Sequence, residues 1–325
     1  MRAIRRVGPG LLLLASLGGT ARVVGNSTPL NPLVLAIVFG AAVGVTVGVP
    51  SWAGPGVDRH KLLLEIGIVL LGAQLTIGGL VSTGPVVLGL AVGVVLAGVL
   101  FVELVGRRVG IESRTRSLLA AGASVCGVSA IIAVAGSIDG NEADISYAAG
   151  TVLLFDAVTL VAFPIAGTAL GLPDRTFGIW AGLSLFSTGP TTAVGFAISE
   201  TAGQWATVTK LVRNTLIGIL AVGYAIRYSS GTGRTDAKEM WYQFPKFLIG
   251  FLLVAVFVNL GTVDVAARTA IGRISDWLFA LAFVGLGVEL NPRRLRATGV
   301  RPLAVVLAQF LTVSLLALGA VRVLV

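Results

Sequence analysis

Long apolar segments recur along the whole chain, and they constrain its fold more than any other feature. Eleven of them approach or exceed the length needed to cross a bilayer, which takes about 20 apolar residues in a helix. They lie at about residues 11–24, 30–49, 61–80, 85–104, 118–136, 145–170, 177–198, 205–226, 244–260, 274–290 and 302–325. Only 12% of the 325 residues are charged, against about 25% in ordinary soluble domains. The sequence therefore predicts an all-α, multi-pass protein of the cell membrane, surrounded by the lipid bilayer.

The first apolar segment follows Arg2, Arg5 and Arg6, an arrangement that secretory signals share. No convincing small-x-small cleavage site follows it. We therefore expect residues 1–26 to be retained as an extra N-terminal helix of one transporter domain that spans residues 1–325.

The placement of basic residues predicts the orientation. With the N-terminus inside, 18 of the 24 Lys and Arg residues fall on inner connections, Arg175 among them, and four fall on outer ones. Lys210 and Arg213, the remaining two, lie within an apolar segment. Because inner loops of membrane proteins are rich in Lys and Arg, this asymmetry predicts an N-in, C-out arrangement of eleven crossings. The basic excess thus reflects topology, and we expect no nucleic-acid partner.

The fifth apolar segment is unusually rich in small and polar residues between positions 122 and 134. It carries Ser124, Cys126, Gly127 and Ser129 where a lipid-facing helix would carry Leu and Ile. One interpretation is an interrupted helix, because backbone freed from a helix is tolerated at membrane depth only beside protein or a watery cavity, as in transporter sites. The alternative is small-residue packing between helices.

The seventh segment has a similar interruption. Gly189 and Pro190 should break or kink it, and Ser184 and Ser187 lie just before them. Two such interrupted segments in one chain point to a transporter site near the midplane. We expect them to face each other across a central cavity, with helix N-termini directed at an anion.

Ionisable residues within apolar segments are candidate functional groups, because burying them in a membrane is costly. Lys210 and Arg213 are three residues apart, so they share a helix face and could bind an anion. Alternatively, they pair structurally with Glu65, Asp156 or a helix C-terminus. Asp156 and Glu65 are candidates for the coupling ion; a structural role for Asp156 and a solvated position for Glu65 are the alternatives.

Four motifs resemble the YeiH family of prokaryotic membrane proteins, which is also named for sulfate export. They are Gly-Ala-Ser-Val-Cys-Gly-Val-Ser-Ala (122–130), Gly-Ile-Val-Leu-Leu-Gly (67–72), Lys-Leu-Val-Arg (210–213) and Leu-Gly-Val-Glu-Leu (286–290). The resemblance covers nearly the whole chain. It implies membership of the broad group of cation/proton antiporters and anion transporters, with two inverted five-helix units, residues 30–170 and 176–325. It also implies broken crossing helices at the fifth and tenth segments.

One position departs from the pattern of that family. Similar proteins tend to have His followed by an acidic residue where this chain has Phe186 and Ser187. A possible proton carrier is therefore absent, and the substrate or its coupling could differ here.

Enzyme chemistry fits the sequence poorly. The single histidine, His60, lies in a connection between Arg59 and Lys61, where we expect it to be solvated. The chain has no Walker-type loop and one cysteine, so we expect no cofactor and no metal cluster. An intramembrane enzyme built on Ser124 or Ser129 is the weakest alternative.

The sequence thus favours a secondary-active transporter of a small anion, of the sulfate, organic sulfonate or carboxylate class, coupled to a proton or sodium gradient. A cation/proton exchanger is the main alternative, although fixed positive charges in the site would repel a cation. The substrate, the direction of transport and the coupling ion stay open, and so does a homodimer.

Overall fold

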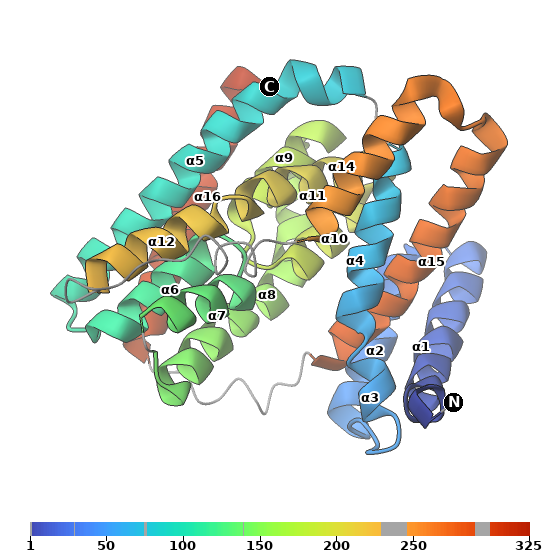
Figure 1. The fold of residues 1–325 in the computed structure, drawn as a ribbon, viewed down its shortest axis with the longest axis horizontal. Coiled ribbons are helices and arrows are strands. Elements are labelled where there is room, and N and C mark those ends of the chain that lie inside the picture. Colours follow the sequence, from blue (N-terminus) through green and yellow to red (C-terminus); the bar gives the residue numbers. More distant parts are fainter. Residues whose placement is uncertain (1, 29, 75–76, 139, 229–245, 290–299) are drawn as a thin grey trace. The chain divides into compact units, whose positions relative to one another are not determined.

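The computed structural model describes residues 2–28, 30–74, 77–138, 140–228, 246–289 and 300–325. Within these ranges the regular structure is entirely helical (Figure 1). Six helices are long and apolar enough to cross a membrane: Arg6–Ser27, Thr83–Arg108, Glu142–Ala169, Glu200–Tyr228, Val265–Glu289 and Val300–Leu324. The prediction of a multi-pass helical membrane protein is confirmed, and each of the eleven apolar segments overlaps helical structure.

The helices form two compact units, each of which draws on both halves of the chain. Unit 1 comprises residues 1–82 and 246–293, and unit 2 comprises residues 83–245 and 294–325. The predicted division into two inverted five-helix units stays a prediction.

Unit 1 is built around one long helix, α15. Its helices are α1 (Arg2–Ser27), α2 (Pro32–Thr46), α3 (Gly54–Val57), α4 (His60–Leu71), the 3-10 turn Gly72–Gln74, α14 (Phe247–Phe257), the π turn Val258–Thr262 and α15 (Val265–Glu289). α15 packs against α2 and α4. A Cβ atom on Gly40 of α2 would lie 2.0 Å from the carbonyl oxygen of Val284, so this packing needs glycine there. α15 is continuous to Glu289, so the break expected in the tenth segment is absent over these residues.

The expectation of a solvated His60 is wrong. Its side chain is only 3% exposed, because His60 begins α4 and packs against Gly285 of α15. Its Nδ1 lies 3.0 Å from the carbonyl oxygen of Val57, and its Nε2 lies 3.6 Å from a carboxylate oxygen of Glu289. Lys61 completes this group with an ion pair of 3.1 Å to Glu289.

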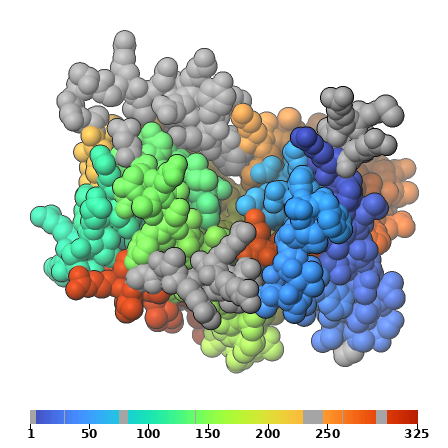
Figure 2. All heavy atoms as spheres, turned by 90° about the horizontal axis from the view of Figure 1, so that it is seen from below, coloured from blue at the N-terminus to red at the C-terminus, as the bar shows by residue number. Residues whose placement is uncertain are grey.

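The described part of unit 2 contains four elements that are long and apolar enough to cross a membrane, and two pairs of short helices. Its helices are α5 (Ile77–Arg108, in this unit from Thr83), α6 (Ser113–Ser124), α7 (Val128–Ser137), α8 (Glu142–Ala169), α9 (Asp174–Ser184), α10 (Thr188–Ile198), α11 (Glu200–Asn214), α12 (Ile217–Tyr228) and α16 (Val300–Leu324). We call the end of unit 2 where α6 and α8 begin its first end. The second end is where α8 ends and α9 begins. Figure 2 shows α7 and α8, in green, at one face of the unit.

α6 and α7 form a hairpin that enters from the first end. α6 runs parallel to α8, because Thr115 hydrogen-bonds to Asp144 and the Cα of Gly122 lies beside Val152. After residue 127 the chain turns back, so that Ile131 of α7 packs against Gly122. A straight helix would separate those two residues by about 13 Å. α7 then returns to the first end, where α8 starts.

α9 and α10 form a second hairpin, which enters from the opposite end. α9 runs parallel to α11, since Gly178 packs against Trp205 and Gly182 packs against Thr209. α10 leads directly into α11 through Ser199, so it must run back toward the second end before α11 begins. The count of eleven crossings is therefore not confirmed, because the fifth and seventh apolar segments each return to the end at which they began.

Each hairpin has its own apolar core. Residues 118–135 of the first hairpin pack with α5, α8, α12 and the start of α16, whereas residues 177–185 of the second pack with α5, α11 and the later part of α16. Phe310 of α16 packs against both cores. Unit 2 thus holds the two hairpin tips between its two cores, at the middle of the long helices.

Candidate functional site

The two hairpin tips are short non-helical segments, residues 125–127 and 185–187. In the first tip, Val125 has φ −117° and ψ −80°, and Gly127 has φ 69° and ψ −135°. In the second, Leu185 and Ser187 are extended, with ψ near 150°. The predicted interruption of both segments is confirmed. The tips meet, since a Cβ atom on Gly127 would lie 2.1 Å from the Ser187 hydroxyl oxygen.

Arg213 joins the two tips through backbone carbonyl oxygens. Its guanidinium is 1% exposed. It donates to Ser124 (2.8 Å) and Ala123 (3.1 Å) at the end of α6, and to Leu183 (2.7 Å) and Leu185 (2.8 Å) at the end of α9. The last carbonyl groups of a helix lack intrahelical donors and carry partial negative charge. Arg213 therefore caps two helix C-termini at once.

Lys210 has the same function one turn earlier on α11. Its ammonium group, which is fully buried, donates to the carbonyl oxygens of Val125 and Leu185, each at 2.7 Å. These contacts use two of the three N–H groups of the lysine and leave one for another acceptor. The bonds of Lys210 and Arg213 agree with the predicted alternative of contact with helix C-termini. Anion binding by these two residues stays a prediction.

Asp156 of α8 reaches the second tip from the other side. Its carboxylate is 2% exposed and accepts a hydrogen bond of 3.2 Å from the backbone N–H of Ser187, the residue that precedes α10. A carboxylate is favourable there, because the N-terminus of a helix carries partial positive charge. The tips thus have cations on their helix C-termini and an anion on the N-terminus of α10.

Several buried polar atoms around the tips accept or donate no hydrogen bond within the described part of the chain. They include the hydroxyl oxygens of Ser124, Ser184 and Thr209, the side-chain carbonyl oxygen of Asn214 and the Oδ2 atom of Asp156. Leaving such a group unpaired costs about 1–3 kcal/mol. Water or a polar ligand at the tips would satisfy them.

The structure gathers most, but not all, of the predicted site residues. Ser124, Cys126, Gly127, Ser184, Ser187, Lys210, Arg213 and Asp156 lie at or beside the tips. Ser129 stands apart, with an exposed side chain on the first turn of α7. Glu65 belongs to α4 of unit 1, outside the unit that carries the tips.

Phe186, where similar proteins tend to have histidine, is part of an aromatic cluster. Its ring centroid lies 5.7 Å from those of Phe155 and Phe310, in edge-on contact with both. The backbone N–H of the neighbouring Ser187 donates to the carboxylate of Asp156. The acidic group at this tip therefore comes from α8.

Sequence reasoning missed Asn214 and Glu103. Asn214 was overlooked because it directly follows Arg213 at the end of the Lys-Leu-Val-Arg motif. An amide side chain inside an apolar segment is nevertheless a reason to expect a buried hydrogen bond. Its Nδ2 donates to the Thr188 hydroxyl at the start of α10, at 3.0 Å. Glu103 was missed because it lies close to the end of a long apolar segment, where a solvated carboxylate is ordinary.

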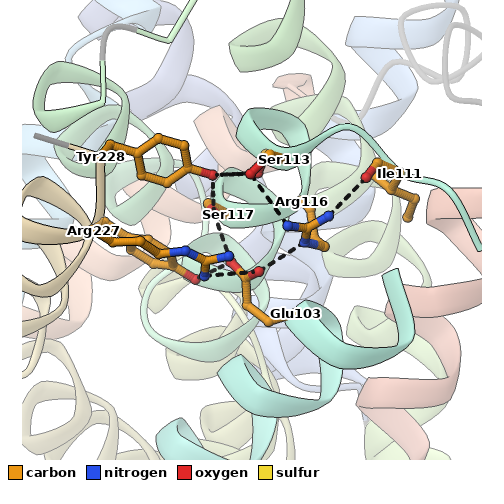
Figure 3. A network of polar contacts seen from close by, with 8 residues as sticks. Glu103, Ile111, Ser113, Arg116, Ser117, Arg227 and Tyr228 are labelled. Atoms are coloured by element: carbon orange, nitrogen blue, oxygen red, sulfur yellow. Dashed lines mark hydrogen bonds and ion pairs between the residues drawn. The ribbon is translucent and has the colours of Figure 1, made fainter. Parts of the chain in front are cut away.

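Glu103 is the centre of a polar network at the first end of unit 2 (Figure 3). Its carboxylate accepts hydrogen bonds from Arg116 (2.8 Å), Ser117 (2.7 Å) and Tyr224 (3.0 Å), and it pairs with Arg227 at 3.1 Å. These partners come from α6 and α12, whereas Glu103 is on α5. The network therefore fixes the base of the first hairpin.

The fold and these tips define a class: multi-pass helical membrane proteins with paired hairpins around buried charges. The chain belongs to the family described as Conserved hypothetical protein 698, which it matches over residues 9–306. A UPF0324 membrane protein of Nitratidesulfovibrio vulgaris is 31% identical over 317 residues, which cover 92% of this chain and 88% of that protein. The predicted resemblance to the YeiH family is thereby confirmed.

Other relatives span the chain to a similar extent. UPF0324 membrane protein TauZ of Paracoccus denitrificans is 28% identical over 324 residues, covering 96% of this chain and 95% of that protein. A UPF0324 membrane protein of Agrobacterium fabrum is 30% identical over 301 residues, covering 90% and 86%. No solved structure matches this chain.

Proposed function

We propose that this protein is a secondary-active transporter that binds a small anion where the two hairpin tips meet. The observation that carries the proposal is the meeting of hairpins from opposite ends of unit 2 around two buried cations. Interrupted helices at mid-depth are how secondary transporters build sites that can be reached from either side of the membrane. Coupling to a proton or sodium gradient supplies the energy.

The charge balance of the tips supports an anionic substrate. Lys210 and Arg213 outnumber Asp156, so the cluster has a formal charge of +1 at neutral pH. An isolated excess charge is costly in a low-dielectric interior. A small oxyanion would offset it and would accept from the N–H group that Lys210 has left over and from the Ser124 and Ser184 hydroxyls.

The proposed orientation is N-in and C-out, with nine crossings and two re-entrant hairpins. One hairpin precedes α8 in the chain and the other follows it. Two crossings are therefore replaced, and the helices after residue 199 keep their predicted directions. Only the two connections that flank α8 change sides. Arg175 moves from the inner to the outer set, so the basic residues divide 17 to five instead of 18 to four. This is still a strong positive-inside signal.

Removing one of the unpartnered hydroxyls tests the site without breaking a bond inside the protein. We expect Ser184→Ala to raise the apparent KM for the anion about tenfold, the equivalent of one hydrogen bond of 1.4 kcal/mol, with unchanged thermal stability. Ser137→Ala is the matched control, because that hydroxyl bonds to its own helix near the base of the first hairpin. Arg213→Gln is a poorer test, since it would also remove the guanidinium from five backbone carbonyl oxygens.

The measurement is uptake into proteoliposomes of labelled sulfate, methanesulfonate and acetate, with sodium or proton gradients imposed. Anion uptake that Ser184→Ala weakens and Ser137→Ala does not would support the proposal. Sodium–proton exchange with no dependence on any anion would instead support the cation exchanger. Equal anion uptake by both variants and the wild type would show that the Ser184 hydroxyl at the tips does not bind the anion, and would contradict the proposed site.

A further inference from the structure

α16 brings a buried amide side chain to the first hairpin tip. We infer that Gln309, beside the Ser124 hydroxyl, accepts a hydrogen bond from a hydroxyl group of the transported anion. The substrate is then a small hydroxylated organic anion, such as a hydroxycarboxylate or a hydroxysulfonate, and not a bare oxyanion. This inference rests on the proposed anion transport and deepens it, because it names the class of substrate.

Gly98 of α5 marks the place where the two polar side chains lie. A Cβ atom on Gly98 would be 2.6 Å from the Ser124 hydroxyl oxygen and 2.8 Å from the Nε2 atom of Gln309. Both groups therefore lie against the backbone of α5, at a residue that has no side chain. The three residues belong to α5, α6 and α16, all of unit 2. Segments far apart in the sequence thus form one polar site next to the first tip.

Gln309 and Ser124 are buried without partners for their side-chain oxygens. Each residue is only 1% exposed. The Oε1 atom of Gln309 and the hydroxyl oxygen of Ser124 make no hydrogen bond within the described part of the chain. Buried polar groups in native proteins are paired with protein, water or a ligand, and an unpaired one destabilises the fold. A leucine on α16 would avoid this cost, so the amide calls for a binding partner.

The unpaired atoms define what a ligand must supply. Besides hydroxyls, they include three acceptor oxygens: Oε1 of Gln309, Oδ1 of Asn214 and Oδ2 of Asp156. A fully ionised oxyanion has no hydrogen to donate, so it satisfies none of the three. A hydroxyl group on the anion donates to such an oxygen. An ammonium group would also donate, but Lys210 and Arg213 repel it.

This polar site is next to the contacts of the buried cations. The backbone carbonyl of Ser124 accepts from Arg213 at 2.8 Å, and that of Val125, the following residue, accepts from Lys210 at 2.7 Å. Neighbouring Cα atoms are about 3.8 Å apart, a distance that a short carbon chain spans. An anion whose carboxylate or sulfonate lies beside Lys210 therefore brings a hydroxyl on a nearby carbon to Gln309.

Pairs of anions with equal charge and equal numbers of heavy atoms isolate the hydroxyl group. Hydroxyacetate and propionate form one pair, and hydroxyethanesulfonate and propanesulfonate form the other. Purified full-length protein in detergent is titrated with each anion, and the dissociation constant is obtained from the increase in thermal stability. We expect the wild type to bind the hydroxylated anion of at least one pair about tenfold more tightly, as one hydrogen bond provides.

Gln309→Leu tests the amide directly. We expect this variant to bind both anions of each pair equally. Its thermal stability without ligand should be unchanged or higher, because the substitution removes a buried group that lacks a partner. Thr312→Ala on the same helix is the matched control, since that exposed hydroxyl bonds to the carbonyl oxygen of Ala308. It should keep the preference of the wild type.

Gly98→Ala tests the same site from α5, whether or not Gln309→Leu folds. The added methyl group takes the place between the Ser124 hydroxyl and the Gln309 amide, so the preference for the hydroxylated anion should again be lost. Gly93→Ala is its control, because a Cβ atom at Gly93 of α5 would meet nothing within 4 Å. This control should bind the anions as the wild type does.

The outcomes separate this inference from the proposed function. If the wild type binds neither hydroxylated anion more tightly than its partner, the role of Gln309 is refuted and anion binding at the tips still stands. A preference that survives in Gln309→Leu or in Gly98→Ala has the same meaning, and the amide then holds only water. If none of the four anions stabilises the wild type, the anion site itself is refuted, and this inference with it.

Discussion

Gly127 is the residue on which the contact of the two hairpins depends most directly. Its φ of 69° lies in the left-handed region, which glycine adopts readily and other residues rarely. Its Cα also faces the Ser187 hydroxyl so closely that no Cβ would fit without movement. Both facts require glycine at this one position, so the tip conformation is specified locally.

We expect Gly127→Ala to lower the free energy of unfolding by about 1–3 kcal/mol, through backbone strain and the displacement of Ser187. Gly136→Ala is the control, because it lies in the same hairpin, within α7, where a Cβ atom would meet nothing within 4 Å. It should be neutral or stabilising by up to about 1 kcal/mol. Thermal unfolding in detergent measures both. Equal stability of the two variants would show that the tips tolerate separation.

At the scale of helices, the sequence predicted which segments exist better than how they run. Each segment expected from apolar length overlaps a helix in the described part of the chain, and small residues located both interruptions. Neither signal can distinguish a broken crossing helix from a hairpin, since residues 118–136 or 177–198 are long enough for either. The direction after the break is decided by partners far along the chain, such as Asp144 for Thr115 or Trp205 for Gly178.

The same limit explains the charged residues of the site. The spacing of Lys210 and Arg213 correctly placed them together. Their acceptors are carbonyl oxygens of residues 25 to 90 positions away, and every residue has a backbone carbonyl, so the sequence does not indicate which of them these side chains contact. The helix-capping contacts could therefore be found only in the structure, and anion binding stays a prediction.

The Glu103 network makes the first hairpin testable as an element. We expect Glu103→Gln to destabilise α6 by about 1–3 kcal/mol, because Arg116 and Arg227 lose their charge partner while the amide keeps some hydrogen bonds. Hydrogen–deuterium exchange should therefore quicken in α6 and stay unchanged in α9. Glu112→Gln, an exposed change just before α6, is the control. Faster exchange in both hairpins alike would contradict an anchor confined to the first.

At the scale of the whole molecule, two units share the chain, and among the described residues the hairpins and the buried Lys210, Arg213 and Asp156 belong to unit 2. The helices of unit 1 make close glycine contacts, such as Gly40 against Val284. The two possible topologies, with nine or with eleven crossings, differ only in how often unit 2 crosses the membrane.

Each of the two connections around α8 lies on one side of the membrane if the interrupted segments are hairpins, and on the other side if they are crossings. With two hairpins and the N-terminus inside, Glu142 lies inside and Asp174 outside; with eleven crossings, the assignments are reversed. Single cysteines at these exposed positions, in a Cys126→Ser background, decide between them. A membrane-impermeant thiol reagent applied to intact cells should label Asp174→Cys and leave Glu142→Cys unlabelled.

Two further positions calibrate that experiment, because both arrangements place them alike. Arg114→Cys should be protected and Thr201→Cys should be labelled in either case, and both side chains are exposed in the structure. Labelling of Glu142→Cys together with protection of Asp174→Cys, against those two references, would restore the crossings and refute the hairpins. Since the proposed site exists only where two hairpin tips meet, that result would also remove the structural basis for anion binding at Lys210 and Arg213.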